Sequence, residues 1–210
     1  ICGLVGKFDR HLEQVRDLVG LREGARQFAA MNALMLDTMT LFIADTYVNE
    51  MPNAEETAEI ALMAADEMRR FGIEPKAALL SHSNFGTSEQ PSAVKMRQVL
   101  ELVRRDEPWL EVDGEMHGDL ALDAVAREAI MSTSSLSGSA NLLVMPNIDA
   151  ANIAYNLLKT AAGGGIASAT DYVLLVPLDP AALVRVPSAP AATADLAGIG
   201  SRRPPSRPRA

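Results

Sequence analysis

The pattern of apolar and polar positions is clearest between residues 140 and 165. Residues 141–145 form an apolar run short enough to be a strand that is buried on both faces. A proline ends this run, and Asn147 and Asp149 could each cap the helix that follows. Helical spacing places three apolar residues on one face of that helix, and a run of glycines ends it; the three are Ile153, Leu157 and Leu158. The stretch therefore predicts a strand and a helix joined by a short polar turn.

Three earlier segments repeat this order of strand, polar turn and helix. The apolar runs at residues 40–44, 76–80 and 110–112 are each followed by a polar cluster and then by helical periodicity. Asn53 and Glu56 have the spacing of a capping box at the start of the first of these helices. Successive strand–helix units indicate an α/β fold with a mostly parallel sheet and flanking helices.

The two ends of the chain do not follow this pattern. Residues 7–37 read as a helix with interruptions, in which the apolar run at residues 31–36 is ambiguous, and we assign residues 1–37 to a helical remnant of a preceding region. Residues 38–167 make up the α/β lobe. The remainder, residues 168–210, is rich in proline, alanine and arginine, and we expect a divergent, disordered tail. Within it, residues 172–177 have the composition of one further strand.

Polar residues gather where the predicted strands end. In a parallel sheet the carboxyl ends of the strands meet at one edge, which is where ligands bind in open α/β folds. We therefore expect these clusters to form one ligand-facing edge, at which the loop of residues 81–88 could cradle a phosphate or a thioester carbonyl. The candidate ligand-binding residues are Ser81, Ser83, Asn84, Gly86, Asp113, Glu115, Asp149 and Asn152. The more ordinary interpretation is that the serine and threonine hydroxyls satisfy backbone groups of the turns, and that Asp113 and Glu115 bond the neighbouring loops.

Composition and charge narrow the classes of partner. The 210 residues carry a net charge of −8, which argues against nucleic acid or an anionic membrane as the main partner. The only cysteine, Cys2, excludes a disulfide framework and fits a cytoplasmic protein. His82 and His117 lack the spacing of a metal site, so we expect no metal. The chain has no initiator methionine, and we expect it to begin inside a longer gene product.

Several segments together resemble one known family. They are GLREGARQFAAMNALML, LFIADTYVN, AEIALMAADEMRRFGIEPKAALLSHSNFG, VDGEMHGDLAL and LLVMPNIDAANIAYNLLK. In order and spacing they resemble the phosphate acetyl/butyryltransferase family over residues 4–167. The resemblance is strongest to the phosphotransacetylase-like domain at the C-terminus of bacterial NADP-dependent malic enzymes.

The resemblance implies one lobe of the two-lobed phosphotransacetylase fold, which is like that of isocitrate dehydrogenase, with acyl-CoA bound in the cleft between lobes. Acetyl-CoA or coenzyme A would then be the ligand, and no cofactor would be tightly bound.

This chain departs from the family pattern in two places. Stand-alone transferases usually read SxSTKGS where this chain has residues 81–86 without the lysine. From about residue 168 the family pattern stops, so its catalytic residues cannot be placed here. An ending of this composition is typical of a shifted reading frame in GC-rich DNA.

Three functions remain open on this basis. The leading one is an acetyl-CoA-sensing and oligomerising domain of a malic enzyme that is inactive as a fragment and forms a homo-oligomer in the full-length protein. The second is a phosphate acetyltransferase, which transfers an acetyl group between acetyl phosphate and coenzyme A. The third is a structural assembly module that binds no ligand.

Overall fold

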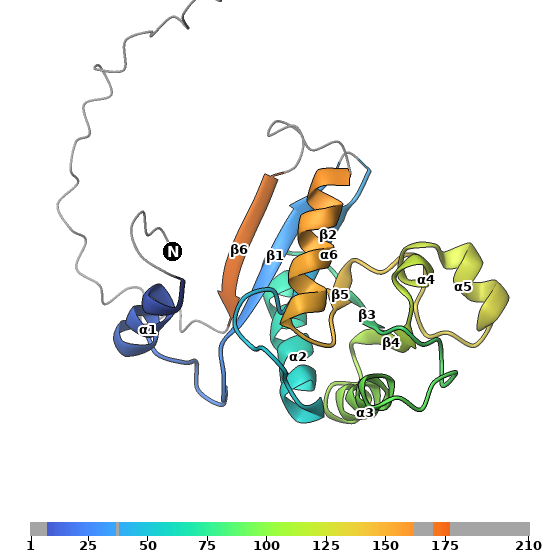
Figure 1. The fold of residues 1–210 in the computed structure, drawn as a ribbon, viewed down its shortest axis with the longest axis horizontal. Helices are drawn as coiled ribbons and strands as arrows, with labels where there is room; N and C mark the ends of the chain where they lie inside the picture. Colours follow the sequence, from blue (N-terminus) through green and yellow to red (C-terminus); the bar gives the residue numbers. More distant parts are fainter. Residues whose placement is uncertain (1–7, 37, 162–169, 177–210) are drawn as a thin grey trace, which may run out of the picture.

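The computed structural model describes residues 8–36, 38–161 and 170–176, and these residues form one sheet with flanking helices (Figure 1). The helices are α1 (Phe8–Leu18), α2 (Ala54–Arg70), α3 (Pro91–Asp106), α4 (Gly118–Leu122), α5 (Ala124–Ile130) and α6 (Ile148–Ala161). The strands are β1 (Ala29–Met35), β2 (Thr40–Ala44), β3 (Lys76–Leu80), β4 (Glu111–Met116), β5 (Leu142–Val144) and β6 (Thr170–Val176). None of the described helices is long and apolar enough to span a membrane.

The sheet is mostly parallel, as the sequence pattern predicts. Its strand order is β4-β3-β5-β2-β1-β6. The first four strands of this order pair in parallel. β5 lies between β3 and β2, and its residue Leu142 is opposite Ala77 of β3 on one side and Phe42 of β2 on the other. β1 and β6 then extend the sheet in antiparallel register. The four parallel strands place their carboxyl ends at a single edge.

The core has two layers, one on each face of the sheet. Alternate residues of a strand point to opposite faces. In β3, Leu79 packs with the residues of α2 and α3, whereas Ala78 and Leu80 pack with those of α4 and α6. Short side chains fill much of the space under α2, where Ala61 and Ala64 are fully buried. The helices can therefore lie close to the sheet although the chain has few aromatic residues.

The assignment of residues 1–37 to a helical remnant is wrong for residues 29–35, where the apolar run at residues 31–36 is ambiguous in the sequence alone. Residues 8–18 form α1, but residues 29–35 form β1, which pairs with β2 from Met31 opposite Ala44 to Met35 opposite Thr40. The alanine, leucine and methionine residues of β1 have high helix propensity, and pairing inside a buried sheet overrides it. The lobe therefore extends below residue 38 and includes β1.

The predicted tail also contains regular structure. Residues 170–176 form β6, which pairs with β1 along its whole length, so the expectation of disorder over residues 168–210 is wrong for this segment. The suggestion of a strand near residues 172–177 is confirmed as far as residue 176. The rest of the tail prediction, together with the glycines at 163–165, lies outside the described residues.

A buried arginine fixes the segment that leads into β5. The guanidinium of Arg127 is fully buried and donates to the carbonyl oxygens of Leu120, at 2.9 Å, and Leu136, at 3.0 Å. It also donates to the hydroxyl oxygen of Ser134 at 3.1 Å. Because the carbonyl dipoles point at the charge, they stabilise it without a carboxylate partner among the described contacts.

The sequence predicts caps for α2 and α6, and the structure agrees with the prediction fully at α2 and only in part at α6. At α2 the capping box is confirmed: the Asn53 side chain accepts from the Glu56 N–H at 2.9 Å, and the Glu56 carboxylate accepts from the Asn53 N–H at 2.8 Å. At α6 the Asn147 side chain accepts from the Ala150 N–H at 2.9 Å. Asp149 is exposed in the first turn, so the expectation that it caps α6 is wrong. It already lies inside the helix, whereas a cap comes from the residue before it.

We expect Asn147→Ala to lower the free energy of unfolding by about 1–2 kcal/mol, because the cap hydrogen bond is lost. Asp149→Ala should lower it by only about 0.3–0.5 kcal/mol, through the helix dipole. Urea unfolding at low and high salt checks this difference, since salt screens the dipole effect and leaves the cap hydrogen bond. A larger loss for Asp149→Ala at both salt concentrations would contradict the assignment.

Candidate functional site

The loops that follow β2 and β5 meet at the carboxyl edge of the sheet, where a side chain of α3 contacts both of them. The Asn152 side chain of α6 donates to the Thr46 carbonyl at 3.4 Å, and the Ile148 N–H donates to the Glu50 carbonyl at 3.2 Å. The Lys95 ammonium of α3 donates to the carbonyl oxygens of Pro52, at 2.8 Å, and Pro146, at 2.5 Å. The expectation of one shared edge is thus confirmed for these loops, while ligand binding there stays a prediction.

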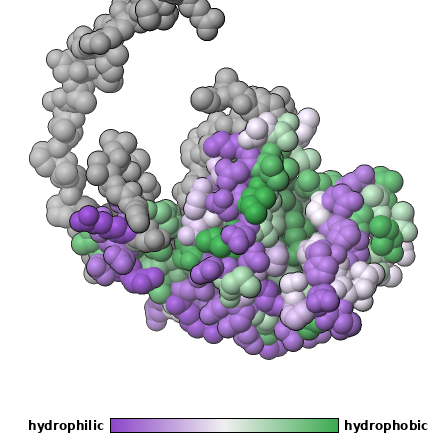
Figure 2. All heavy atoms as spheres, viewed as in Figure 1, coloured by the Kyte–Doolittle hydropathy of each residue, from purple (hydrophilic) through white to green (hydrophobic). Residues whose placement is uncertain are grey.

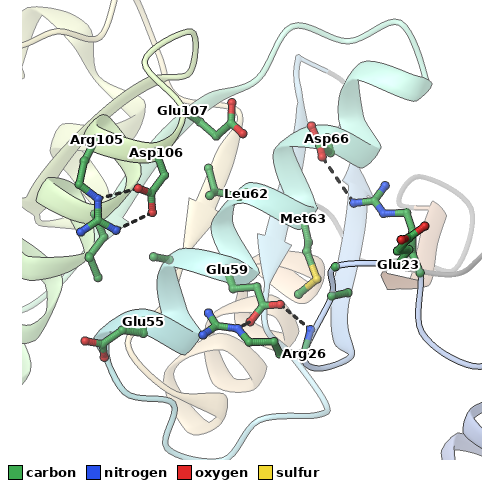
Figure 3. Close-up of a pocket in the computed structure, with 15 residues that line it drawn as sticks. Glu23, Arg26, Glu55, Glu59, Leu62, Met63, Asp66, Arg105, Asp106 and Glu107 are labelled. Carbon is green, nitrogen blue, oxygen red and sulfur yellow. Dashed lines mark hydrogen bonds and ion pairs between the residues drawn. The ribbon is translucent and has the colours of Figure 1, made fainter.

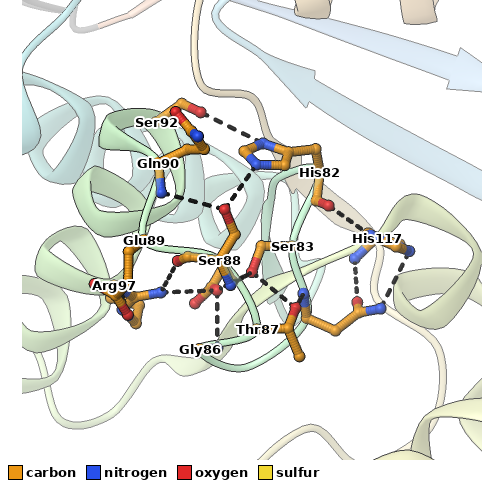
Figure 4. Close-up of polar contacts among 12 residues, drawn as sticks. His82, Ser83, Gly86, Thr87, Ser88, Glu89, Gln90, Ser92, Arg97 and His117 are labelled. Carbon is orange, nitrogen blue, oxygen red and sulfur yellow. Dashed lines mark hydrogen bonds and ion pairs between the residues drawn. The ribbon is translucent and has the colours of Figure 1, made fainter.

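A buried carboxylate organises the loop after β3 (Figure 4). Glu115, near the end of β4, has no exposed surface. Its Oε1 accepts hydrogen bonds from the Ser83 hydroxyl at 2.6 Å, the Gly86 N–H at 2.9 Å and the Arg97 guanidinium at 3.2 Å. These contacts connect the loop, α3 and β4 at a single oxygen atom. Ser83, Gly86 and Glu115, three of the predicted site residues, are therefore brought together.

The loop closes on itself around Ser83. The Ser83 oxygen accepts from the Ser88 N–H at 3.0 Å and lies 3.1 Å from the Thr87 hydroxyl oxygen. The Thr87 oxygen accepts from the Asn84 N–H at 3.1 Å. Gly86 has φ of 90°, a conformation that side chains rarely adopt, and this lets its N–H point at the carboxylate. The hydroxyls thus satisfy turn groups, as the ordinary interpretation predicts.

The ionised form of Glu115 is favoured in the folded protein. Burial by itself would raise the pKa of the carboxyl group. The hydrogen bonds from Ser83 and Gly86 and the charge of Arg97 outweigh burial, and the pKa is lowered. The second oxygen, Oε2, and the Ser81 hydroxyl are both buried and have no hydrogen-bond partner in the described structure. Both atoms belong to predicted site residues at the ends of neighbouring strands.

The two histidines nearby bond to the loops and do not converge on a common point. His117 Nε2 lies 2.9 Å from the His82 carbonyl oxygen, and its Nδ1 lies 3.1 Å from the Asn84 side-chain nitrogen. His82 Nε2 lies 3.1 Å from the Ser88 hydroxyl oxygen. Among the described residues there is no group of three or more histidine, cysteine, aspartate and glutamate side chains that could hold a metal ion.

Asp113 and Asp149 stand apart from this network. Asp113 lies inside β4, because the strand runs to Met116 and not only to residue 112 as predicted. It is 5% exposed and accepts from the Arg104 guanidinium at 3.1 Å and the Ser135 N–H at 2.8 Å. It therefore bonds neighbouring segments, as the ordinary interpretation predicts for it. Asp149 is exposed at the start of α6.

A further buried carboxylate was not among the candidates. Asp45, directly after β2, accepts from the N–H groups of Ala30 at 2.9 Å, Tyr47 at 3.1 Å and Asn49 at 2.9 Å. Burial raises the pKa of this carboxyl group, and the hydrogen bonds oppose the increase only in part. Its position directly after a buried strand is a signal that the sequence carries. It shapes the loop that Asn152 contacts.

Fold and site together define an α/β lobe with a polar carboxyl edge built on buried carboxylates. The family model for phosphate acetyl/butaryl transferase matches residues 1–168, and the chain belongs to this family. The match confirms the family resemblance and almost the same range. Residues beyond 168 lie outside it.

Similar proteins fall into two groups. The chain is 58% identical over 166 residues to the NADP-dependent malic enzyme of Escherichia coli (strain K12), covering 79% of this chain and 22% of that protein. It is 43% identical over 124 residues to the phosphate acetyltransferase of Paracoccus denitrificans, covering 59% of this chain and 39% of that protein. The chain thus spans about a fifth of the length of the malic enzymes that it resembles.

Solved structures support the fold. A phosphotransacetylase from Streptococcus pyogenes superposes with a TM-score of 0.77 at 24% identity, covering 84% of this chain and 53% of that one. EutD phosphotransacetylase from Staphylococcus aureus gives a TM-score of 0.73 at 24% identity, covering 80% of this chain and 51% of that one. The described lobe therefore has the fold of about half of a phosphotransacetylase chain.

We expect Glu115→Gln to lower the free energy of unfolding by about 2 kcal/mol at pH 7, because an amide matches this set of donors poorly. The pKa of Glu115 is lowered on folding, so its charge stabilises the protein above the unfolded pKa of about 4.3 and loses this effect as the pH falls through the folded pKa. In urea unfolding, the difference between wild type and variant should therefore stay constant from pH 7 to about pH 5 and shrink as the pH falls below the unfolded pKa of about 4.3.

Glu101→Gln is the matched control, since Glu101 is exposed on α3 and has no bonded partner among the described contacts. This variant should differ little from wild type at any of these pH values. A Glu115→Gln effect that is as small as the control, or that grows on acidification, would contradict the role of the buried charge.

Proposed function

We propose that this chain is an acyltransferase-like lobe of a malic enzyme that binds acetyl-CoA at its carboxyl edge as a signal and does not transfer the acyl group. The proposal is supported by family membership, by the identity to malic enzymes and by the polar loops at the edge. The ligand would contact the loop after β3 and the start of α6. Ser81, Asn84 and Asn152 would supply the polar contacts.

The main support for this proposal is that the positively charged side chains near the edge already have partners within the protein. Residues 81–88 include no lysine or arginine. The guanidinium of Arg97 is bonded to Glu115 and Glu89, and the ammonium of Lys95 is bonded to two carbonyl oxygens. Acyl transfer from an acyl phosphate to the thiol of coenzyme A releases inorganic phosphate, and positive charge near that leaving group stabilises the transition state. Since Arg97 is ion-paired and the donors of Lys95 are directed at two carbonyl oxygens, the edge suits the thioester and amide groups of acetyl-CoA better than a reacting acyl phosphate.

Phosphate acetyltransferase activity is the second candidate, favoured by the similarity to proteins of that name. A structural module without ligand is the third. A cytoplasmic location is supported by the single cysteine. The net charge of −8 supports a small-molecule ligand over nucleic acid or a membrane surface.

Titration calorimetry with acetyl-CoA, combined with an assay of acetyl-CoA formation from acetyl phosphate and coenzyme A, distinguishes the three functions. We expect saturable binding without turnover, and about tenfold weaker binding for Asn84→Ala, since that loss corresponds to about one good hydrogen bond. Thr38→Ala, which changes an exposed threonine at the amino end of β2 and thus at the opposite edge of the sheet, should bind like wild type. Turnover above background would favour the transferase, and no binding heat would favour the structural module.

We also propose that α6 forms a contact between copies of this lobe. Ile153 and Leu157 lie one turn apart on α6 and are 58% and 64% exposed, while Ala151 and Tyr155 of the same helix pack inward. Figure 2 shows hydrophobic surface over α6 beside a hydrophilic strip. A helix face can pair with itself across a two-fold axis, which is the commonest arrangement of homo-oligomers. This supports the oligomerising role that the resemblance implies.

Leu157→Glu should shift the oligomer to monomer in a light-scattering dilution series, because the contact would bury two like charges next to each other. Val125→Glu, on α5 and 79% exposed, should leave the mass unchanged. A wild-type chain that stays monomeric at all concentrations, or equal effects of both variants, would contradict the contact.

A further inference from the structure

A groove lies on another part of the surface, away from the loops of the carboxyl edge. A groove of about 600 Å³ opens between residues 22–26, α2 and the end of α3 (Figure 3). Apolar side chains of α2 and α3 line part of it, namely Leu62, Met63 and Leu102. Charged side chains line the rest. None of its lining residues belongs to the candidate site at the carboxyl edge.

The lining of this acidic groove has more carboxylates than cations. Six carboxylates face three arginines, and each arginine is paired: Arg22 with Asp66 at 3.5 Å, Arg26 with Glu59 at 3.1 Å and Arg105 with Asp106 at 2.6 Å. The other three carboxylates, Glu23, Glu55 and Glu107, form no ion pair among the described residues. Glu107 accepts a hydrogen bond from the indole of Trp109. The groove thus offers three unneutralised negative charges beside apolar surface.

The same chain carries a segment of opposite character. Residues 201–210 read SRRPPSRPRA, with four arginines, three prolines and no acidic side chain. These residues lie outside the described part of the chain. Arginine is well suited to carboxylates because its guanidinium donates to both oxygens. Prolines in an extended segment pack on apolar surface without unmet N–H groups.

The sheet brings the two parts of the chain close together. β6 is antiparallel to β1, and its last residue, Val176, lies opposite Ala29. Arg26, which lines the groove, is three residues before Ala29, and three residues span at most about 11 Å. The 24 residues that follow β6 and precede residue 201 can span at most about 86 Å, which sets the distance that the chain can cover. The arginine-rich segment can therefore reach the groove of its own molecule at a high effective concentration.

We propose that the acidic groove is the docking site for residues 201–210 of the same chain. The arginines would pair with Glu23, Glu55 and Glu107, and the prolines would pack on the apolar part of the groove. The segment would bind in an extended form, which requires no fold of its own. Docking of this kind places the tail on a surface distinct from the carboxyl edge, so it does not depend on acetyl-CoA binding there.

The single tryptophan of the chain makes the proposal measurable. Trp109 contacts Glu107 at the groove, so a dansyl acceptor on residue 210 reports docking by energy transfer from Trp109. The full chain with Cys2→Ser and Ala210→Cys carries the label at one site. Energy transfer should be high at low salt and should fall severalfold near 1 M salt, where charges are screened beyond about 3 Å. It should stay constant on dilution, because the segment binds its own chain.

Two charge variants test the specificity of docking. Glu23→Gln, Glu55→Gln and Glu107→Gln together should lower transfer to the level of a tail with all four arginines changed to glutamine. Glu13→Gln, Glu74→Gln and Glu128→Gln, which make the same charge change at exposed positions outside the groove, should leave transfer unchanged. Far-ultraviolet circular dichroism controls for folding of each variant. The proposal would be overturned if the two triple variants had equal effects. It would also be overturned if the energy transfer did not change with salt concentration, or if it were lost on dilution.

Discussion

The carboxylate of Glu115 is the contact on which the candidate site depends. It lies fully buried at the end of β4, where an uncompensated charge would cost several kcal/mol. The compensation comes from a serine hydroxyl, a glycine N–H and an arginine of α3, all directed at one oxygen atom. Because two of these donors lie in the loop after β3 and the third lies on α3, satisfying one charge on β4 also sets the path of that loop.

The family fold and the loop at the carboxyl edge can be compared separately. The sheet and helices superpose on phosphotransacetylases with TM-scores of 0.73 and 0.77. The loop at the edge, however, turns its hydroxyls inward and carries no lysine or arginine. Arg97 and Lys95 hold the loops together from α3. The positive charges of Arg97 and Lys95, which could bind a ligand, thus hold segments of backbone in place.

The antiparallel extension of the sheet has a separate consequence. β1 and β6 lie beyond the parallel strands, and β6 joins residues far along the chain to the segment that follows α1. The end of β6 lies near the groove whose excess of carboxylates contrasts with the basic end of the chain. Backbone pairing at the sheet edge therefore determines which surfaces the remainder of the chain can reach.

Local signals in the sequence determined the parallel half of the fold. Short apolar runs, the Asn53–Glu56 capping box and the proline at the start of α3 each depend on neighbouring residues, and the structure confirms them. The sequence also located the polar edge and the loop that contains Ser83 and Gly86. Only tertiary structure decided that residues 29–35 form a strand, since pairing with β2 and β6 outweighs their helix propensity. It also decided that Asn147 caps α6 while Asp149 does not, and that Asp113 bonds Arg104 inside β4. Spacing along the chain cannot distinguish these outcomes, because burial and hydrogen-bond partners come from residues distant in sequence.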